Sequence, residues 1–245
     1  MSEIIKTEAV VLKKLDYGDT SSITSLYTQE LGRISAIIKG GRSPKSKMGT
    51  VVDPLNHIQI VLYKKDSREV QLLSGAEIIS HFPKLKEDLN ALKYSYAVIE
   101  LVQKLIPDNE PNKRLFDGIV RILSLFNSSD EKPEIIFSRF FLFFITEIGY
   151  EIQLDKCSVC GSDNLERKEL GFNFDRGLLC ETCKRENIDN YKIDVELFKY
   201  LKCLKSNKSV KSIKETTIRN AIDFFNIYLK FHITDFKGIQ SFKLF

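Results

Sequence analysis

Two Cys-x-x-Cys pairs constrain the fold of this chain more than any other feature of its sequence. Cys157 and Cys160 form the first pair, and Cys180 and Cys183 form the second after an interval of 19 residues. Each pair can present two thiolates to one ion, and two pairs complete the tetrahedral sulfur shell typical of structural zinc. Iron–sulfur clusters usually have less symmetric cysteine patterns. We therefore predict one structural Zn²⁺ ion held by these four cysteines.

Other chemistries explain these cysteines less well. A redox-active CxxC begins a helix in a thioredoxin-like context, and a second matched pair argues against it. Four thiolates leave no open position for a catalytic water, and His57, His81 and His232 are distant in sequence. Because four of the five cysteines are paired in this way, a metal site in a reducing compartment is favoured over disulfides. We expect the metal to fold a short segment with little core of its own, and Cys203 to be a small buried hydrophobe.

The first third of the chain carries the pattern of β-strands. Short apolar, β-branched runs alternate with turn residues, and no helical period interrupts them. The runs are Ala9–Leu12, Ile23–Thr28, Ile34–Ile38, Ile58–Tyr63 and Val70–Leu73. Five short strands favour a small OB-type barrel, and an SH3-like barrel is the nearest alternative.

The apolar period changes to that of helices after Pro83. Steps of three and four residues predict helices over 85–99, 115–126 and 133–148, and later over 195–204 and 218–229. We therefore predict an α+β multidomain chain. An OB-type β-barrel covers residues 1–80, and an α-helical domain covers 81–154 and 185–245. A four-cysteine zinc module, residues 155–184, is inserted between the helices.

A local concentration of positive charge is a better guide to partners than the total charge. The chain has 37 basic and 33 acidic residues, so its net charge is only +4. Between Arg33 and Val52 there are five basic residues and no acid; the basic residues are Arg33, Lys39, Arg42, Lys45 and Lys47. Such a Gly- and Ser-rich segment at a barrel rim suits a phosphate backbone, although it could also be merely solvated. Tyr17 and Tyr27 could add stacking faces, although an interior place for Tyr27 is equally compatible.

A second basic run and the absence of catalytic motifs complete the pattern. Lysines recur at every third position between Lys199 and Lys214, and we expect them to be solvated surface or a secondary polyanion contact. The sequence has no phosphate-binding GxxxxGK[ST] loop, no GxSxG elbow and no HExxH helix, so we predict no enzyme activity. The first residues lack the pattern of a signal peptide, and no apolar run reaches the ~20 residues of a membrane span. We expect a cytoplasmic location.

Short segments along the whole chain carry a family resemblance: Glu8–Lys14, Tyr17–Thr20, Tyr27–Gly32, Ile37–Arg42, Lys45–Lys47, Phe140–Tyr150, Leu154–Cys157, Phe172–Gly177, Leu179–Cys183 and Gly238–Phe242. Together they resemble the bacterial recombination mediator family RecO. The resemblance implies a DNA repair and DNA recombination protein that binds single- and double-stranded DNA without nucleotide hydrolysis. It implies annealing of complementary strands coated by single-strand-binding protein (SSB), contact with the SSB C-terminal tail through the helical domain, and loading of RecA together with RecR. By position, Lys39, Arg42, Lys45 and Lys47 fall on the family's DNA-binding loop, and the expected location is the nucleoid.

Two departures from the family pattern qualify this expectation. Ser43 and Pro44 stand where many relatives are more basic, so the affinity for DNA is expected to be weaker. Some family members lack the cysteines, so zinc is not the chemistry of the function. An RNA-binding OB-fold module and a zinc-stapled protein-interaction adaptor are the alternative functions.

Overall fold

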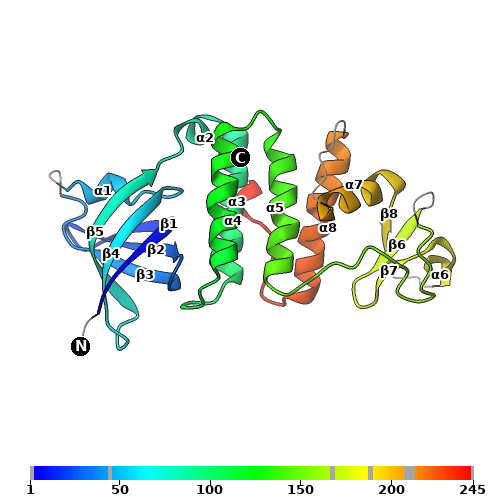
Figure 1. The fold of residues 1–245 in the computed structure, drawn as a ribbon, viewed down its shortest axis with the longest axis horizontal. Helices are drawn as coiled ribbons and strands as arrows, with labels where there is room; N and C mark the ends of the chain where they lie inside the picture. The colour runs from blue at the N-terminus through cyan, green and yellow to red at the C-terminus, as the bar shows by residue number, and fades with distance from the viewer. Residues whose placement is uncertain (1–2, 44–45, 166–168, 187–189, 207–212, 244–245) are drawn as a thin grey trace. The chain divides into compact units, whose positions relative to one another are not determined.

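The computed structural model describes residues 3–43, 46–165, 169–186, 190–206 and 213–243. Its elements group into two compact units (Figure 1). The first unit comprises residues 1–133 and the C-terminal residues 239–245, and the second comprises residues 134–238. The cysteine segment lies wholly within the second unit. The three domain boundaries expected from the sequence remain a prediction.

The first unit contains a closed five-stranded barrel. Its strands are β1 (Glu3–Tyr17), β2 (Ser21–Thr28), β3 (Gly32–Ile38), β4 (His57–Lys64) and β5 (Val70–Ser80). They follow each other in the order β1-β2-β3-β5-β4, and β1 also pairs with β4 to close the sheet. Strands β3 and β5 run parallel, and the other neighbours are antiparallel. This Greek-key closure is that of an OB-type barrel, so the predicted fold class is confirmed.

Strand alternation decides which side chains fill the barrel. In β3, buried residues at Ile34, Ala36 and Ile38 alternate with partly exposed ones, and β4 buries Ile58 and Ile60 in the same way. Since fully burying one such side chain contributes roughly 1.5–3 kcal/mol, this inward face supplies most of the barrel's stability. The side chains on the outward face are therefore not required for the barrel core and can contact a ligand.

The barrel depends on the unusual length of β1. Its first half pairs with β4, and its second half pairs with β2. The register with β2 shifts between Val11 and Lys13, where an extra residue bends the strand. The sequence predicted only the apolar centre of this strand, because its ends carry polar residues.

A short helix, α1 (Met48–Val51), lies within the segment that the sequence predicted to be an irregular loop. Met48, Val51 and the following Val52 pack against the apolar core of the barrel. The Lys14 ammonium donates to the carboxylate of Asp53 at 2.8 Å and so fastens the end of this segment. The loop prediction is therefore wrong for these four residues, because the apolar side chains of Met48 and Val51 gain more from packing on the core than from solvation.

Three helices complete the first unit. They are α2 (Pro83–Glu87), α3 (Leu89–Leu105) and α4 (Lys113–Ser128). Asp88 caps α3 by accepting from the N–H groups of Asn90 and Ala91, and Asn112 caps α4 in the same way. The C-terminal segment, with the short 3₁₀ helix η1 (Ser241–Lys243), returns to α3, where the Glu100 carboxylate accepts two backbone N–H bonds of 2.7 Å.

The second unit combines three long helices with a small sheet. The helices are α5 (Pro133–Glu147), α7 (Val195–Lys205) and α8 (Glu215–His232). The sheet consists of β6 (Leu170–Asn173), β7 (Gly177–Leu179) and β8 (Tyr191–Ile193). The short helix α6 (Glu181–Glu186) lies between β7 and β8 in the sequence. The long helices confirm the predicted periods, and Gly149 ends the α5 region with a φ of +89°. Among the described helices, none combines the length and apolarity needed to cross a bilayer.

Aromatic rings join the small sheet to the helices. Phe172 of β6 meets Phe224 of α8 edge to face, with ring centroids 5.0 Å apart, and Phe141 of α5 meets Phe225 at 5.6 Å. Such pairs contribute about 0.5–1.5 kcal/mol beyond their buried area. The sheet of the cysteine segment is therefore held on a rigid helical base.

Three lysines of the run between Lys199 and Lys214 make ion pairs within the protein. Lys202 and Lys205 both donate to the carboxylate of Asp155, at 2.7 and 3.0 Å, and Lys214 pairs with Glu196. Two further lysines of the run, Lys208 and Lys211, lie outside the described residues. The ion pairs with Asp155 hold the entry to the cysteine segment against α7.

Gly32 should be the least replaceable glycine of the barrel. Its φ is +69°, and an added Cβ would lie 2.3 Å from the carbonyl oxygen of Glu110. We expect Gly32→Ala to lower the free energy of unfolding by more than the ~1–2 kcal/mol that a left-handed backbone alone costs. Gly40 is the matched control, because its φ is +65° and nothing lies within 4 Å of its Cβ position. Urea unfolding of both variants measures the difference, and equal losses would contradict the close approach at Gly32.

Candidate metal centre and nucleic-acid interface

The four paired cysteines meet at one point. Their Sγ atoms all lie within 4.8 Å of one another, and those of Cys160 and Cys180 are 3.7 Å apart. A tetrahedron with Zn–S bonds of about 2.3 Å has edges of about 3.8 Å, so the observed separation fits such a shell. The prediction that these four residues come together as one potential metal site is confirmed.

Local backbone bonds position the two CxxC turns. The Gly161 N–H donates to the Cys157 carbonyl at 2.9 Å, and Gly161 has a φ of +75°, which closes the first turn tightly. Ser158 N–H donates to the carbonyl of Leu178 in β7 at 2.8 Å. The second pair brackets the start of α6, directly after β7. The two turns are thus held together by the sheet as well as by any bound ion.

The pKa values of the clustered thiols indicate that a cation must compensate their negative charge. Burial acts to raise the pKa of Cys157, but backbone N–H groups, including those of Cys160 and Cys180, hold that pKa at about 6. For Cys183, burial and the neighbouring sulfurs raise the pKa to about 12. Four adjacent thiolates therefore form together only beside a compensating positive charge, which a divalent ion supplies. Cys203 lies on α7 outside this cluster and is half-buried rather than fully buried as expected.

Arg33 lies near the start of β3, and the other predicted basic residues follow the end of that strand. Lys39, Arg42 and Lys47 are exposed, and Lys45 lies outside the described residues. Arg42 ties the segment to the β1–β2 turn. Its backbone N–H donates to the Thr20 carbonyl at 2.8 Å, and its guanidinium donates to the Gly18 carbonyl at 3.1 Å and pairs with the Asp16 carboxylate at 3.4 Å. The segment and the β1–β2 turn therefore form one rim of the barrel.

Two residues that the sequence suggested for nucleic-acid contact, Arg33 and Tyr27, make contacts inside the protein instead. Arg33 pairs with Asp108, with 2.8 Å between Nε and Oδ1, and its guanidinium also donates to the Gln103 carbonyl. Tyr27 is fully buried beside Phe116 of α4. Both side chains fasten the barrel to the helices of the first unit. Of the two tyrosines that the sequence suggested for stacking, Tyr17 is the exposed one, at 55%.

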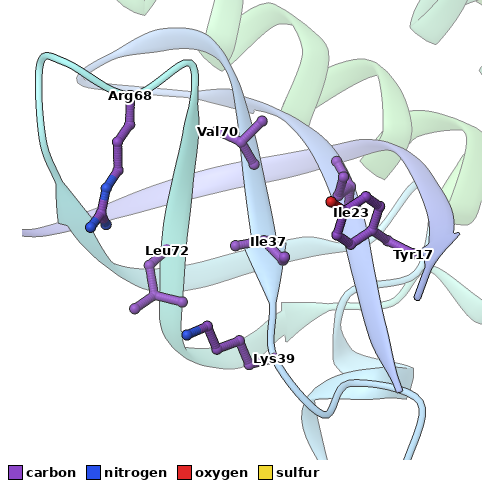
Figure 2. Close-up of a pocket in the computed structure, with 7 residues that line it drawn as sticks. All are labelled: Tyr17, Ile23, Ile37, Lys39, Arg68, Val70 and Leu72. Carbon is purple, nitrogen blue, oxygen red and sulfur yellow. The ribbon is translucent and has the colours of Figure 1, made fainter. Parts of the chain in front are cut away.

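A hollow of about 370 Å³ opens on the outer face of the barrel. Figure 2 shows Tyr17 and Ile23 at one end, Ile37 in the middle and Leu72 towards the other end. The cationic ends of Lys39 and Arg68 both point to the Leu72 side of the hollow (Figure 2). Neither cation makes an ion pair with a described residue, so both charges are available to an anionic ligand.

Arg68 is a site residue that the sequence prediction missed. It lies in the β4–β5 turn, and the buried amide of Gln71 shapes that turn by accepting from Lys65 N–H at 2.8 Å and donating to the Arg68 carbonyl at 2.6 Å. Arg68 and Lys39 line the same hollow only because β3 and β5 run side by side in parallel. A local count of charges carries no signal for this non-local pairing.

Comparison with known proteins agrees with this architecture. The family model described as Recombination protein O N terminal matches residues 1–82, and the model described as Recombination protein O C terminal matches residues 86–237. The chain belongs to the RecO family. The boundary between the two RecO family models falls directly after β5, where the barrel ends and the helices begin.

Individual RecO proteins support the same assignment. The DNA repair protein RecO of Chlorobium limicola is 34% identical over 71% of this chain and 69% of its own length. That of Chlorobium phaeobacteroides is 36% identical over 72% and 67% of the two chains. The DNA repair protein RecO of Chloroherpeton thalassium is 26% identical, and the match covers 99% of this chain and 98% of the relative. The family assignment establishes a role in DNA repair and recombination.

Loss of one cysteine pair should remove the metal and weaken the second unit. We expect the purified chain to contain one metal ion, measured by elemental mass spectrometry, and Cys157→Ser/Cys160→Ser to contain almost none. Because metal binding contributes directly to folding, the double variant should also unfold at a lower temperature. Cys203→Ser, outside the cluster, is the control that should retain the ion. Full metal content in the double variant would contradict the assignment of these ligands.

Proposed function

We propose that this chain is a non-enzymatic DNA repair and recombination mediator. It binds single- and double-stranded DNA, anneals complementary strands coated by SSB and, together with RecR, helps to load RecA. The observation that carries the proposal is the rim of the OB-type barrel. There Lys39 joins the exposed basic segment to the hollow, in a chain that belongs to the RecO family.

The barrel rim supplies the affinity for phosphate. Lysine and arginine side chains neutralise phosphates and release the counterions condensed on the nucleic acid. If about five phosphates are engaged, the logarithm of the single-strand affinity falls with the logarithm of salt concentration at a slope near −3.5. Lys39, Arg42 and Lys47 are the described residues assigned to this role, together with Lys45. Arg33 is assigned a smaller share, because its side chain is only 23% exposed and is paired with Asp108 at 2.8 Å.

The remaining elements serve recruitment and support. The helical part of the chain binds the acidic C-terminal tail of SSB, so that two coated strands are brought to one surface and their bases can pair. This step is supported by the family resemblance. The ion in the cysteine cluster is Zn²⁺, since a closed shell of four thiolates matches its structural sites. Its role is to stabilise the small sheet of β6, β7 and β8, and the protein acts in the bacterial cytoplasm at the nucleoid.

Annealing of complementary strands without ATP tests the proposal. Two fluorescent oligonucleotides, each coated with cognate SSB, should anneal several-fold faster when the protein is added. Lys39→Ala/Lys47→Ala should slow annealing and flatten the salt slope of binding to bare strands by about 1.4, since each lost phosphate contact removes about 0.7. For the salt slope on bare strands, the matched control is Lys84→Ala/Lys113→Ala, which removes two exposed charges from helices of the same unit and should leave the slope unchanged.

The alternative functions give different results in the same assay. An RNA-binding module would bind an RNA oligonucleotide more tightly than a DNA oligonucleotide of matched sequence. A protein-interaction adaptor would show no salt-dependent binding to either. An unchanged annealing rate, despite binding to coated strands, would contradict the mediator proposal.

A further inference from the structure

The outer face of the barrel carries a continuous row of apolar side chains. On a strand that borders solvent, outward positions are usually polar, so an apolar row across every strand marks an interaction surface. Each member lies directly opposite the next one on the neighbouring strand. In order, the members are Leu15 (β1), Ile23 (β2), Ile37 (β3), Leu72 (β5), Tyr63 (β4) and Ile4 (β1). The two ends of the row are strongly exposed, with Leu15 at 52% and Ile4 at 64%.

The hollow lies over the centre of this row. Ile23, Ile37 and Leu72 form its apolar floor, and the Tyr17 ring stands at one end of it (Figure 2). At about 370 Å³, it is within the range of about 300–1,000 Å³ typical of small-ligand sites. Its lining includes two cations and no carboxylate. The hollow therefore combines a flat apolar floor and an aromatic ring with positive charge at its border.

We propose that this hollow binds unpaired nucleobases of single-stranded DNA, with the apolar floor and Tyr17 contacting base faces while Lys39 and Arg68 contact the flanking phosphates. The inference rests on the proposed function and identifies the part of the DNA, the base faces, that this surface contacts. Base stacking on an aromatic ring tolerates every sequence, because each base has a π-face. Lys39 belongs both to the hollow and to the basic segment, so one strand can run continuously from the segment into the hollow.

The chemistry of the hollow distinguishes single strands from duplexes. In a duplex the base faces are stacked on one another, and only base edges and phosphates are accessible in the grooves. A duplex can thus use the cations of the rim but not the apolar floor. The hollow also holds bases unstacked and exposed for pairing, which is the state that annealing to a second strand requires.

The Arg68 side of the hollow is fixed before any ligand binds. Gln71 is only 8% exposed, and its amide makes three hydrogen bonds to the backbone of residues 65 and 68. On the Tyr17 side, the contacts of Arg42 with Gly18 and Thr20 hold the β1–β2 turn. Because both borders are preorganised, little binding energy is lost in ordering them.

An oligonucleotide that keeps its phosphates but lacks its bases tests the inference. The probes are an oligothymidine several times longer than the ~4–16 nucleotides that one OB barrel covers, and an abasic strand of equal length. Fluorescence anisotropy should show that the protein binds oligothymidine about tenfold more tightly than the abasic strand. Tyr17→Ser/Leu72→Asn should remove most of this difference while leaving the affinity for the abasic strand within about twofold, because the phosphate contacts remain.

Matched variants separate a lost contact from a damaged barrel. Ile79→Ser changes an apolar side chain of similar exposure, 48%, near the far end of β5, and should leave both affinities unchanged. Tyr17→Phe keeps the ring and should restore the preference for bases that Tyr17→Ser weakens. The thermal unfolding temperature of each variant, measured alongside, shows whether the barrel is intact.

The outcomes also separate this inference from the proposed function. Equal binding of the oligothymidine and the abasic strand by the unmodified protein would overturn the base-binding role and leave the DNA-binding function standing. No binding of either strand would overturn both. A preference for bases that survives Tyr17→Ser/Leu72→Asn would place the base contacts elsewhere and refute this hollow as their site.

Discussion

Closure of the five-stranded barrel is the constraint on which the candidate interface depends. β1 pairs with β4 along its first half and with β2 along its second half, so one strand holds both edges of the sheet. Closure sends every second side chain into a dry interior and leaves the others on a curved outer surface. It also brings β3 beside β5, which places Lys39 and Arg68 at the border of one hollow although they lie on different turns.

The part of the fold set by local pattern was predictable from the sequence. Alternating apolar residues located all five barrel strands, and steps of three and four residues located α4, α5, α7 and α8. The helix predicted over 85–99 is divided at the extended residue Asp88 into α2 and α3. The strands β6, β7 and β8 were missed because each has only three or four residues, which is too short for a period to show. The helix α1 was missed because it has four residues and lies among glycine, serine and lysine.

The candidate sites differ in the same way. The four cysteines were predictable because zinc-ligand spacing is a local property, and the structure brings their sulfurs together. The nucleic-acid surface was only partly predictable, since a charge count marks Lys39 but cannot show that Arg33 is paired with Asp108. Arg68 and Leu72 join the site through the parallel pairing of β3 with β5, which no local pattern reports. In the proposed function the two sites have separate roles: a metal ion stabilises one unit, and the barrel face of the other unit binds the nucleic acid.

Amide hydrogen exchange, measured with and without single-stranded DNA, tests the central claim that the outer barrel face is the interface. Three segments should exchange more slowly in the complex: residues 15–23, residues 37–43 and residues 65–72. Residues 157–165 and 169–183, around the metal centre, should exchange at an unchanged rate. Slowed exchange confined to the cysteine segment, with none in the three barrel segments, would contradict the account.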